Sequence, residues 1–189
     1  MATTDAIAFV GDTIKALLEN GLATLSPKPT VLLSTPDDFK SSAPTPPTVT
    51  VFLYHIGIAG EMRNAAGRSQ LNGTWRRPPL PLELHFLVTP WAKTARDAYR
   101  IIGVIAQLFY DHALLRFDEL QGDKVWAPDD TVEIVMESLP VDTLYDIWEP
   151  TDIPYKLSLT YLVRILGIDS GILTNTAPVA VATFPKVSV

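Results

Sequence analysis

Two residues in this sequence have the types and spacing needed for acid–base chemistry. Glu83 and His85 lie two positions apart in the stretch RRPPLPLELHFLVTPWA, residues 76–92. Successive side chains of an extended strand point to opposite sides, so residues two apart share a side. A carboxylate beside an imidazole can act as a general acid and base, as a hydrolase would require. The same spacing occurs on any solvated strand face, and the sequence favours that second interpretation.

The other residues that could serve catalysis or metal binding are scattered. His55 lies in an apolar stretch, which is typical of a core histidine, and His112 lies near the end of a predicted helix. The sequence contains no H-E-x-x-H, G-x-S-x-G, G-x-G-x-x-G or Walker A pattern. It also contains no cysteine, which excludes disulfides, thiolate catalysis and Cys-based zinc sites. We therefore expect no enzyme activity, no cofactor and no metal.

The composition is that of one folded domain. Hydrophobic residues make up 47% of the 189 residues, and the mean hydropathy is +0.18. The formal net charge of −6 argues against nucleic-acid binding. A membrane-spanning helix needs a run of about 18 apolar residues, and none occurs. The N-terminus, MATTDAIAFVGD, has no basic segment before its apolar residues, so we expect synthesis and folding in the cytoplasm.

Period-two alternation predicts strands at residues 80–89, 131–139 and 155–166, with further strands at 30–34 and 48–58. One side of the three alternating strands is apolar. It carries Leu80, Leu82, Leu84, Phe86, Val88, Val132, Ile134, Met136, Tyr155, Leu157, Leu159, Tyr161, Val163 and Ile165. The other side is charged. It carries Glu83, His85, Glu133, Glu137, Lys156 and Arg164.

Helical periodicity predicts two main helices, at about residues 4–20 and 93–115, each with one apolar face. Those faces can cover the apolar side of the sheet and leave the charged side to water or to a partner. The sequence therefore predicts an α+β, two-layer domain, with a mixed, mostly antiparallel sheet and both main helices packed on one face. We place this domain at residues 1–169, followed by an extended C-terminal arm at 170–189. The proline-rich stretch 35–48 is predicted to be an exposed loop.

Charge is distributed unevenly along the chain. The loop before residue 80 contains four arginines, Arg63, Arg68, Arg76 and Arg77, and one acid, Glu61. The segment 125–155 contains eight acids and no Lys or Arg, and among them Asp129, Asp130, Glu133 and Glu137 are candidate contact residues. The pattern fits an ordinary solvated surface. It also fits a head-to-tail contact in which the basic loop of one copy meets the acidic region of the next, and such contacts can close into a ring.

Four segments in this order resemble one known family. They are FLYHIGIAGEMRN, RRPPLPLELHFLVTPWA, KTARDAYRIIGVIAQLFYDHALL and LYDIWEPTDIPYKLSLTYLVRIL. The chain resembles the cap, or tail-terminator, family of contractile injection systems. These systems are phage-tail-like particles such as the antifeeding prophage and the virulence cassettes. Longer members have an additional C-terminal region, and this chain is expected to be little more than the shared domain and a tail.

The resemblance implies a structural protein with a phage tail-terminator-like fold and no cofactor. It implies a homo-hexameric ring on the baseplate-distal end of the inner tube and sheath, which ends their polymerisation and joins them. Assembly would take place in the bacterial cytoplasm, and the cap would then remain part of the particle. It implies no contact with nucleic acid and no membrane insertion.

The C-terminal stretch APVAVATFPKVSV is a further candidate contact, because Val179, Val181 and Phe184 belong to a β-prone sequence that could dock on an adjacent chain as a strand. A frayed terminus is the competing interpretation. Two other functions stay open at this point. One is a monomeric domain that binds a small ligand on the polar sheet face, and the other is a hydrolase that uses Glu83 and His85.

Overall fold

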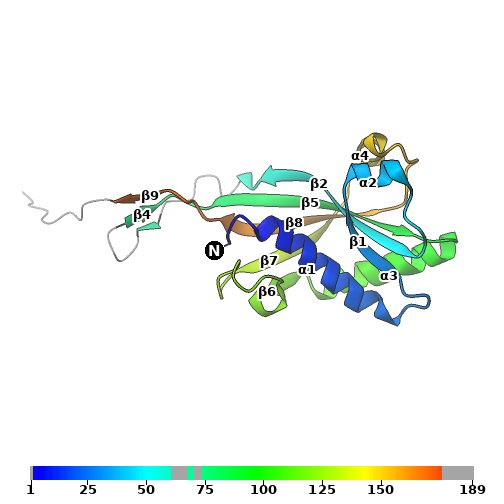
Figure 1. Ribbon diagram of the computed structural model, residues 1–189, viewed down its shortest axis with the longest axis horizontal. Helices are drawn as coiled ribbons and strands as arrows, with labels where there is room; N and C mark the ends of the chain where they lie inside the picture. Colours follow the sequence, from blue (N-terminus) through cyan, green and yellow to red (C-terminus); the bar gives the residue numbers. More distant parts are fainter. Residues whose placement is uncertain (1, 61–67, 70–73, 176–189) are drawn as a thin grey trace, which may run out of the picture.

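The structure, a computed structural model, describes residues 2–60, 68–69 and 74–175. Its centre is a six-stranded sheet (Figure 1). The strand order is β1 (Thr30–Ser34), β2 (Thr48–Ile58), β5 (Leu80–Trp91), β8 (Leu159–Ile168), β7 (Thr131–Glu137) and β6 (Leu114–Arg116). β1 pairs with β2 in parallel, and every other neighbouring pair of this sheet is antiparallel. The predicted mixed, mostly antiparallel sheet is confirmed.

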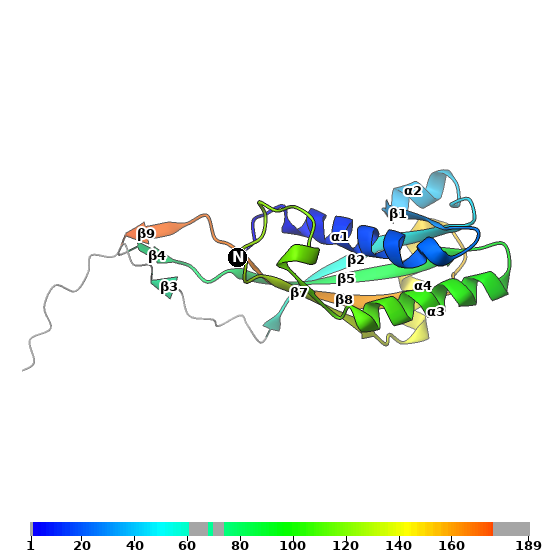
Figure 2. The same cartoon turned by 90° about the horizontal axis from the view of Figure 1, so that it is seen from below.

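Two main helices, α1 (Ala6–Gly21) and α3 (Ala95–Asp111), pack on one face of this sheet (Figure 2). Ile14 and Ile105 meet Leu84 and Val163 in the main core, where Leu84, Ile105 and Val163 are completely buried. Burial of these apolar side chains provides most of the stability of such a domain. The prediction that the alternating strands and the two helices share one core is therefore confirmed.

The predicted ends of three elements were wrong, and one of them is β7, which ends at Glu137 rather than at residue 139. α3 ends at Asp111 rather than near residue 115, and the chain then forms the edge strand β6, which buries Leu115. β8 begins at Leu159 rather than 155, because its ladder partners end there: Leu159 pairs with Val88, and Thr160 pairs with the last residue of β7. Leu157 lies before the strand and Met136 near the end of β7, and both are about half exposed. The alternating pattern around Leu157 therefore begins before the first paired residue of β8, whereas Met136 pairs with Tyr161 and is exposed within the ladder.

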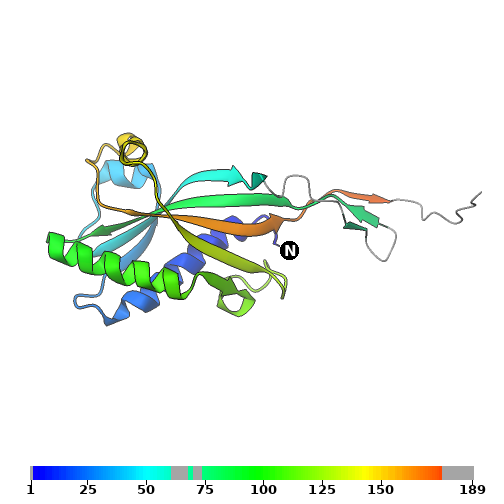
Figure 3. The ribbon, with the colours of Figure 1, turned by 180° about the vertical axis from the view of Figure 1, so that it is seen from behind.

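The second face of the sheet is partly covered. The short helices α2 (Pro36–Ser41) and α4 (Val141–Trp148) lie over one end of it (Figure 3). Phe39 and Trp148 pack there against Trp91, with ring centroids 5.9 Å and 6.1 Å from the Trp91 ring. Leu87 completes this small second core. The sequence predicted that this second face would be left wholly to water or to a partner. That prediction is wrong at the end of the sheet where α2 and α4 form the second core.

The stretch predicted to be a proline-rich loop therefore contains a helix. Thr35 and Asp38 form a capping box at the start of α2, where the Thr35 N–H donates to the Asp38 carboxylate at 2.7 Å. This hydrogen bond lowers the pKa of Asp38. The described residues also form 3-10 turns at η1 (Leu22–Thr24), η3 (Phe117–Glu119) and η4 (Glu149–Thr151).

A second, three-stranded sheet extends beyond one end of the main sheet (Figure 1). Its order is β3 (Arg68–Ser69), β4 (Thr74–Arg76) and β9 (Leu173–Asn175), and both of its pairs are antiparallel. Gly167 marks the point of departure, with a φ of +138° that favours glycine. A Cβ atom at that position would lie 2.7 Å from the Cβ of Pro79. β9 belongs to the segment predicted as the C-terminal arm, so the first part of that segment is paired with β4.

Candidate assembly surface

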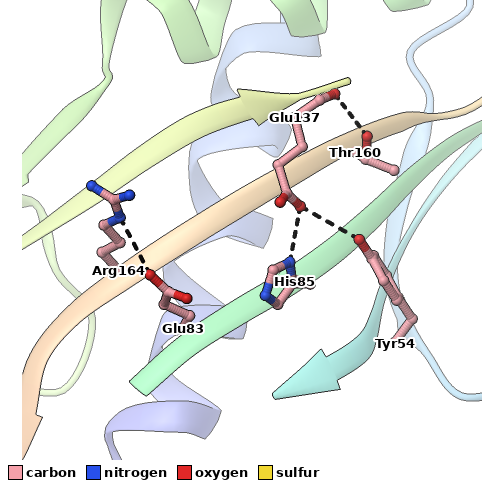
Figure 4. A network of polar contacts seen from close by, with 6 residues as sticks. All are labelled: Tyr54, Glu83, His85, Glu137, Thr160 and Arg164. Carbon is pink, nitrogen blue, oxygen red and sulfur yellow. Dashed lines mark hydrogen bonds and ion pairs between the residues drawn. The ribbon is translucent and has the colours of Figure 1, made fainter. Parts of the chain in front are cut away.

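A polar network occupies the uncovered part of the second face (Figure 4). Its centre is Glu137, whose Oε2 lies 2.9 Å from Nδ1 of His85 and accepts a hydrogen bond from the Tyr54 hydroxyl at 3.4 Å. The hydroxyl of Thr160 donates to the backbone carbonyl of Glu137 at 2.9 Å. Four strands, β2, β5, β7 and β8, are therefore held together by the carboxylate and the backbone carbonyl of Glu137.

Glu83 belongs to a separate group of charges on the same face. Nε of Arg164 lies 3.7 Å from Oε1 of Glu83, and its Nη1 lies 3.8 Å from Oε2 of Glu133. The ladder places these residues directly opposite one another across β5, β8 and β7, where opposite charges stabilise a sheet. Glu83 pairs with Arg164 and His85 pairs with Glu137, so the structure gives no support to an acid–base pair of Glu83 and His85.

His55 is not a core histidine, contrary to the prediction from its apolar surroundings. It is exposed, and its ring centroid lies 5.1 Å from that of His85. The reason is a bulge in β2 between Leu53 and His55, which inserts Tyr54 and brings His55 into register with His85. His112 lies where the helix ends, as predicted, with its Nδ1 3.5 Å from Glu119.

Tyr54 makes the stability of the polar face depend on pH in the alkaline range. Burial, then the charge of Glu137 and its hydrogen bond, raises the pKa of Tyr54 from its ordinary value of 10.0 to about 12. A tyrosine whose pKa is higher in the folded chain than in the unfolded chain stabilises the fold at pH values below its unfolded pKa. This contribution to the unfolding free energy is lost as the pH rises through the pKa of the folded chain.

We therefore expect the unfolding free energy to fall between pH 10 and about 12, and to fall less in Tyr54→Phe. Denaturant titrations at a series of pH values measure this. The variant keeps part of the decline, because burial also raises the pKa of Tyr161. Identical declines in both proteins would contradict the role of Tyr54.

The basic candidate residues belong to the extension. Arg68 in β3 and Arg76 in β4 are in register opposite each other, and Arg77 is exposed just after β4. Arg63, Val179, Val181 and Phe184 lie outside the described residues.

The four acidic candidates differ in their surroundings. Asp129 is exposed, whereas Asp130 is only 3% exposed and its carboxylate accepts the Ala127 N–H at 2.9 Å. Asp130 therefore stabilises a turn. Glu133 and Glu137 take part in the two polar groups described above. The sequence indicated correctly that Glu133 and Glu137 share the polar face, but it could not indicate which residues they contact.

Other acids of the same segment form the exposed surface at the far end of the molecule. Asp142, Asp146 and Glu149 are exposed on α4 and η4, at the opposite end of the main sheet from the extension (Figure 1). These acids therefore lie far from the arginine-containing strands of the extension. The acids that create this separation are those of α4, not the four singled out from the sequence.

A family comparison decides what kind of protein carries these surfaces. The model of the Pvc16 N-terminal domain family matches residues 10–182. The chain belongs to this family. The match confirms the resemblance to cap and terminator proteins of contractile injection systems that the four sequence segments showed. The surfaces described above therefore belong to a member of the Pvc16 N-terminal domain family.

Two solved structures have the same fold. One is the sheath/tube terminator of an extracellular contractile injection system, PVC, in the extended state, with 16% identity and a TM-score of 0.69 over 100% of this chain. The other is the tube-terminating cap of the anti-feeding prophage, with 15% identity and a TM-score of 0.62 over 98% of this chain. The chain spans 65% and 62% of the lengths of those two proteins. No curated protein matches the chain in sequence.

The fold similarity confirms the expected tail-terminator-like α+β architecture. No helix in the described part of the chain is both long and apolar enough to cross a membrane. Within the same residues, no three His, Asp or Glu side chains are grouped so that they could hold a metal ion.

Proposed function

We propose that this chain is a structural cap, or tail terminator, of a contractile injection system. The observation that carries the proposal is the family match over residues 10–182, in a fold shared with a sheath/tube terminator and a tube-terminating cap. The proposed cap is a ring of six copies on the baseplate-distal end of the inner tube and sheath. It ends the polymerisation of both and joins them.

The shape of the chain supports this role. The helices α1, α2, α3 and α4 pack on the main sheet, and the extension of β3, β4 and β9 projects from one end of it (Figure 1). An extension of paired strands whose sequence contains several arginines suits contact with another protein rather than with a small molecule. We propose that Arg63, Arg68, Arg76 and Arg77 contact tube or sheath.

The same proposal gives the C-terminal arm a role. Residues 1–169 would form the body, and residues 170–189 an arm that begins with β9 and continues through Val179, Val181 and Phe184 to an adjacent chain. We propose that the protein assembles in the bacterial cytoplasm and then remains part of the particle. The charged groups of the polar face contact one another, which favours a structural role for Glu83 and His85 over a catalytic one.

The length of the particles tests the proposal. A cap that ends polymerisation fixes where growth stops, so deleting the gene in the producing bacterium should broaden the distribution of particle lengths measured by electron microscopy. Expression of the wild-type chain from a plasmid should restore it. Particles of unchanged, uniform length in the deletion strain would contradict the proposal.

A further inference from the structure

Two exposed surfaces of opposite charge lie at the same end of the main sheet but on different sides of it (Figures 1 and 3). We define the basic α3 surface as Lys93, Arg96, Tyr99, Arg100 and Lys156, and the acidic α4 surface as Val141, Asp142, Tyr145, Asp146 and Glu149. α3 packs on the main core, whereas α4 packs on the small second core across the sheet. The two surfaces adjoin at Lys156, which lies over the Trp91 ring of the second core and directly follows Tyr155, the neighbour of the Tyr145 ring.

The basic α3 surface surrounds a groove that an apolar side chain can enter. Lys93, Tyr99 and Lys156 line a groove of about 700 Å³ together with Pro90 and Leu157. Tyr99 is 62% exposed. Arg100 lines an adjoining hollow that shares Lys93 with the groove. Apolar walls with positive charge at the rim suit an apolar residue that is flanked by carboxylates.

The cations of the basic surface differ in their contacts, and the Lys156 ammonium lies over the Trp91 ring, 5.8 Å from its centroid. In the part of the chain that the structure describes, the guanidinium groups of Arg96 and Arg100 form no ion pair. Arg96 also lies in the first turn of α3, where the helix dipole disfavours a cation. Two unpaired cations beside an exposed tyrosine mark a surface suited to an acidic protein partner.

The acidic α4 surface has the complementary arrangement. Val141 is 61% exposed and Tyr145 is 55% exposed, one helical turn apart. The Tyr145 ring is held against Tyr155, with centroids 4.9 Å apart, so its position is fixed before any contact forms. Asp142, Asp146 and Glu149 lie beside this pair, and their side chains form no ion pair within the described residues.

We propose that the acidic α4 surface of one copy binds the basic α3 surface of the next copy. The two surfaces are different patches of one molecule, so each copy contributes one of them to each neighbour, and repetition closes into a ring when the rotation permits. In such a ring every extension of β3, β4 and β9 points the same way and stays free for tube or sheath. This inference rests on the proposed cap function and identifies the contact that would build its ring.

The absence of cysteine from the wild-type sequence permits a direct test with single cysteine variants. We expect an oxidised mixture of Val141→Cys and Tyr99→Cys to form about tenfold more heterodimer than either homodimer, which corresponds to a preference of about 1.4 kcal/mol. Tyr110→Cys is the matched control. Tyr110 is 85% exposed on the same helix, 11 residues or roughly 16 Å further along it, so its mixture with Val141→Cys should show no such excess.

Three results would overturn the inference. The first is that Val141→Cys forms as much heterodimer with Tyr110→Cys as with Tyr99→Cys. The second is that the Tyr99→Cys homodimer predominates. The third is that Val141→Cys pairs preferentially with Arg77→Cys. The first would indicate collision without a specific contact. The second would indicate a symmetric contact between α3 helices. The third would indicate the head-to-tail contact between extension and acidic region that the sequence first suggested.

Charge reversal provides a second, independent measurement. Arg96→Glu with Arg100→Glu leaves one variant with two acidic surfaces, and Asp142→Lys with Asp146→Lys leaves another with two basic ones. Each alone should lose self-association in sedimentation, and an equimolar mixture should regain it, because every contact in the mixture is again between opposite charges. A mixture that stays as dissociated as its components would contradict the inference.

These experiments use the purified chain without tube or sheath, so they separate the contact from the cap function. If the specific cross-link forms but particle lengths in the deletion strain are unchanged, the proposed α4–α3 contact stands and the proposed cap function is wrong. Loss of length control without the cross-link would retain the cap and reject this contact.

Discussion

Replacing Leu84 with aspartate is expected to prevent the domain from folding. Leu84 is completely buried in β5, between β2 and β8, and belongs to the core under α1 and α3. Loss of its packing costs about 2–5 kcal/mol. An uncompensated buried charge adds about 3–5 kcal/mol. The sum is comparable with the total stability of a typical domain, about 5–15 kcal/mol.

Ile56→Asp is the matched control for this prediction. Ile56 pairs with Leu84 in the β2–β5 ladder, yet its side chain is 44% exposed, so a carboxylate there stays in water. Circular dichroism and thermal melting should show a folded Ile56→Asp protein and no cooperative transition for Leu84→Asp. A cooperative melt of Leu84→Asp near the wild-type temperature would contradict the assignment of the core.

Reversing the charge of Arg76 and Arg77 to glutamate is expected to remove the chain from assembled particles while leaving it folded. Both residues lie outside the main sheet, at the extension, and Arg77 is exposed. Exposed substitutions away from a core change stability by about 0.5 kcal/mol or less. Repulsion replaces attraction if the partner surface is acidic, and like charges in a protein interface cost several kcal/mol.

The control for this variant changes the net charge equally at another place. Lys28→Glu with Lys124→Glu reverses two exposed lysines on the body of the molecule. Quantitative blotting of purified particles measures how much cap they contain. We expect normal occupancy for the lysine variant and little or none for the arginine variant. Equal occupancy of the two would show that the extension is not the site of attachment.

The alternating strands made the main core predictable. Leu82, Leu84, Phe86 and Val88 share the buried face as the sequence indicated, because period-two alternation fixes a side without knowledge of the neighbours. The small second core was not predicted, since Phe39 and Trp148 lie in short proline-flanked segments without periodicity. The local signals for α2 were the Thr35 and Asp38 spacing of a capping box and Pro36 at the first helical position.

The contacts of the candidate site depend on strand register, which the sequence does not contain. Tyr54 and His85 reach Glu137 across 83 and 52 residues of sequence. The inserted residue in β2 places His55 beside His85 instead of in the core, and no composition signal marks it. Charge separation along the chain was visible in the sequence, but only the folded chain shows that the acids of α4 lie far from the extension while those of β7 are paired.

The central claim is that this chain closes the end of a contractile particle. The most direct measurement is electron microscopy of particles from the deletion strain complemented with a gold-labelled copy of the chain. We expect the gold label at the baseplate-distal end of the particle, at the height where tube and sheath stop. Label distributed along the sheath, at the baseplate or absent from the particles would contradict it.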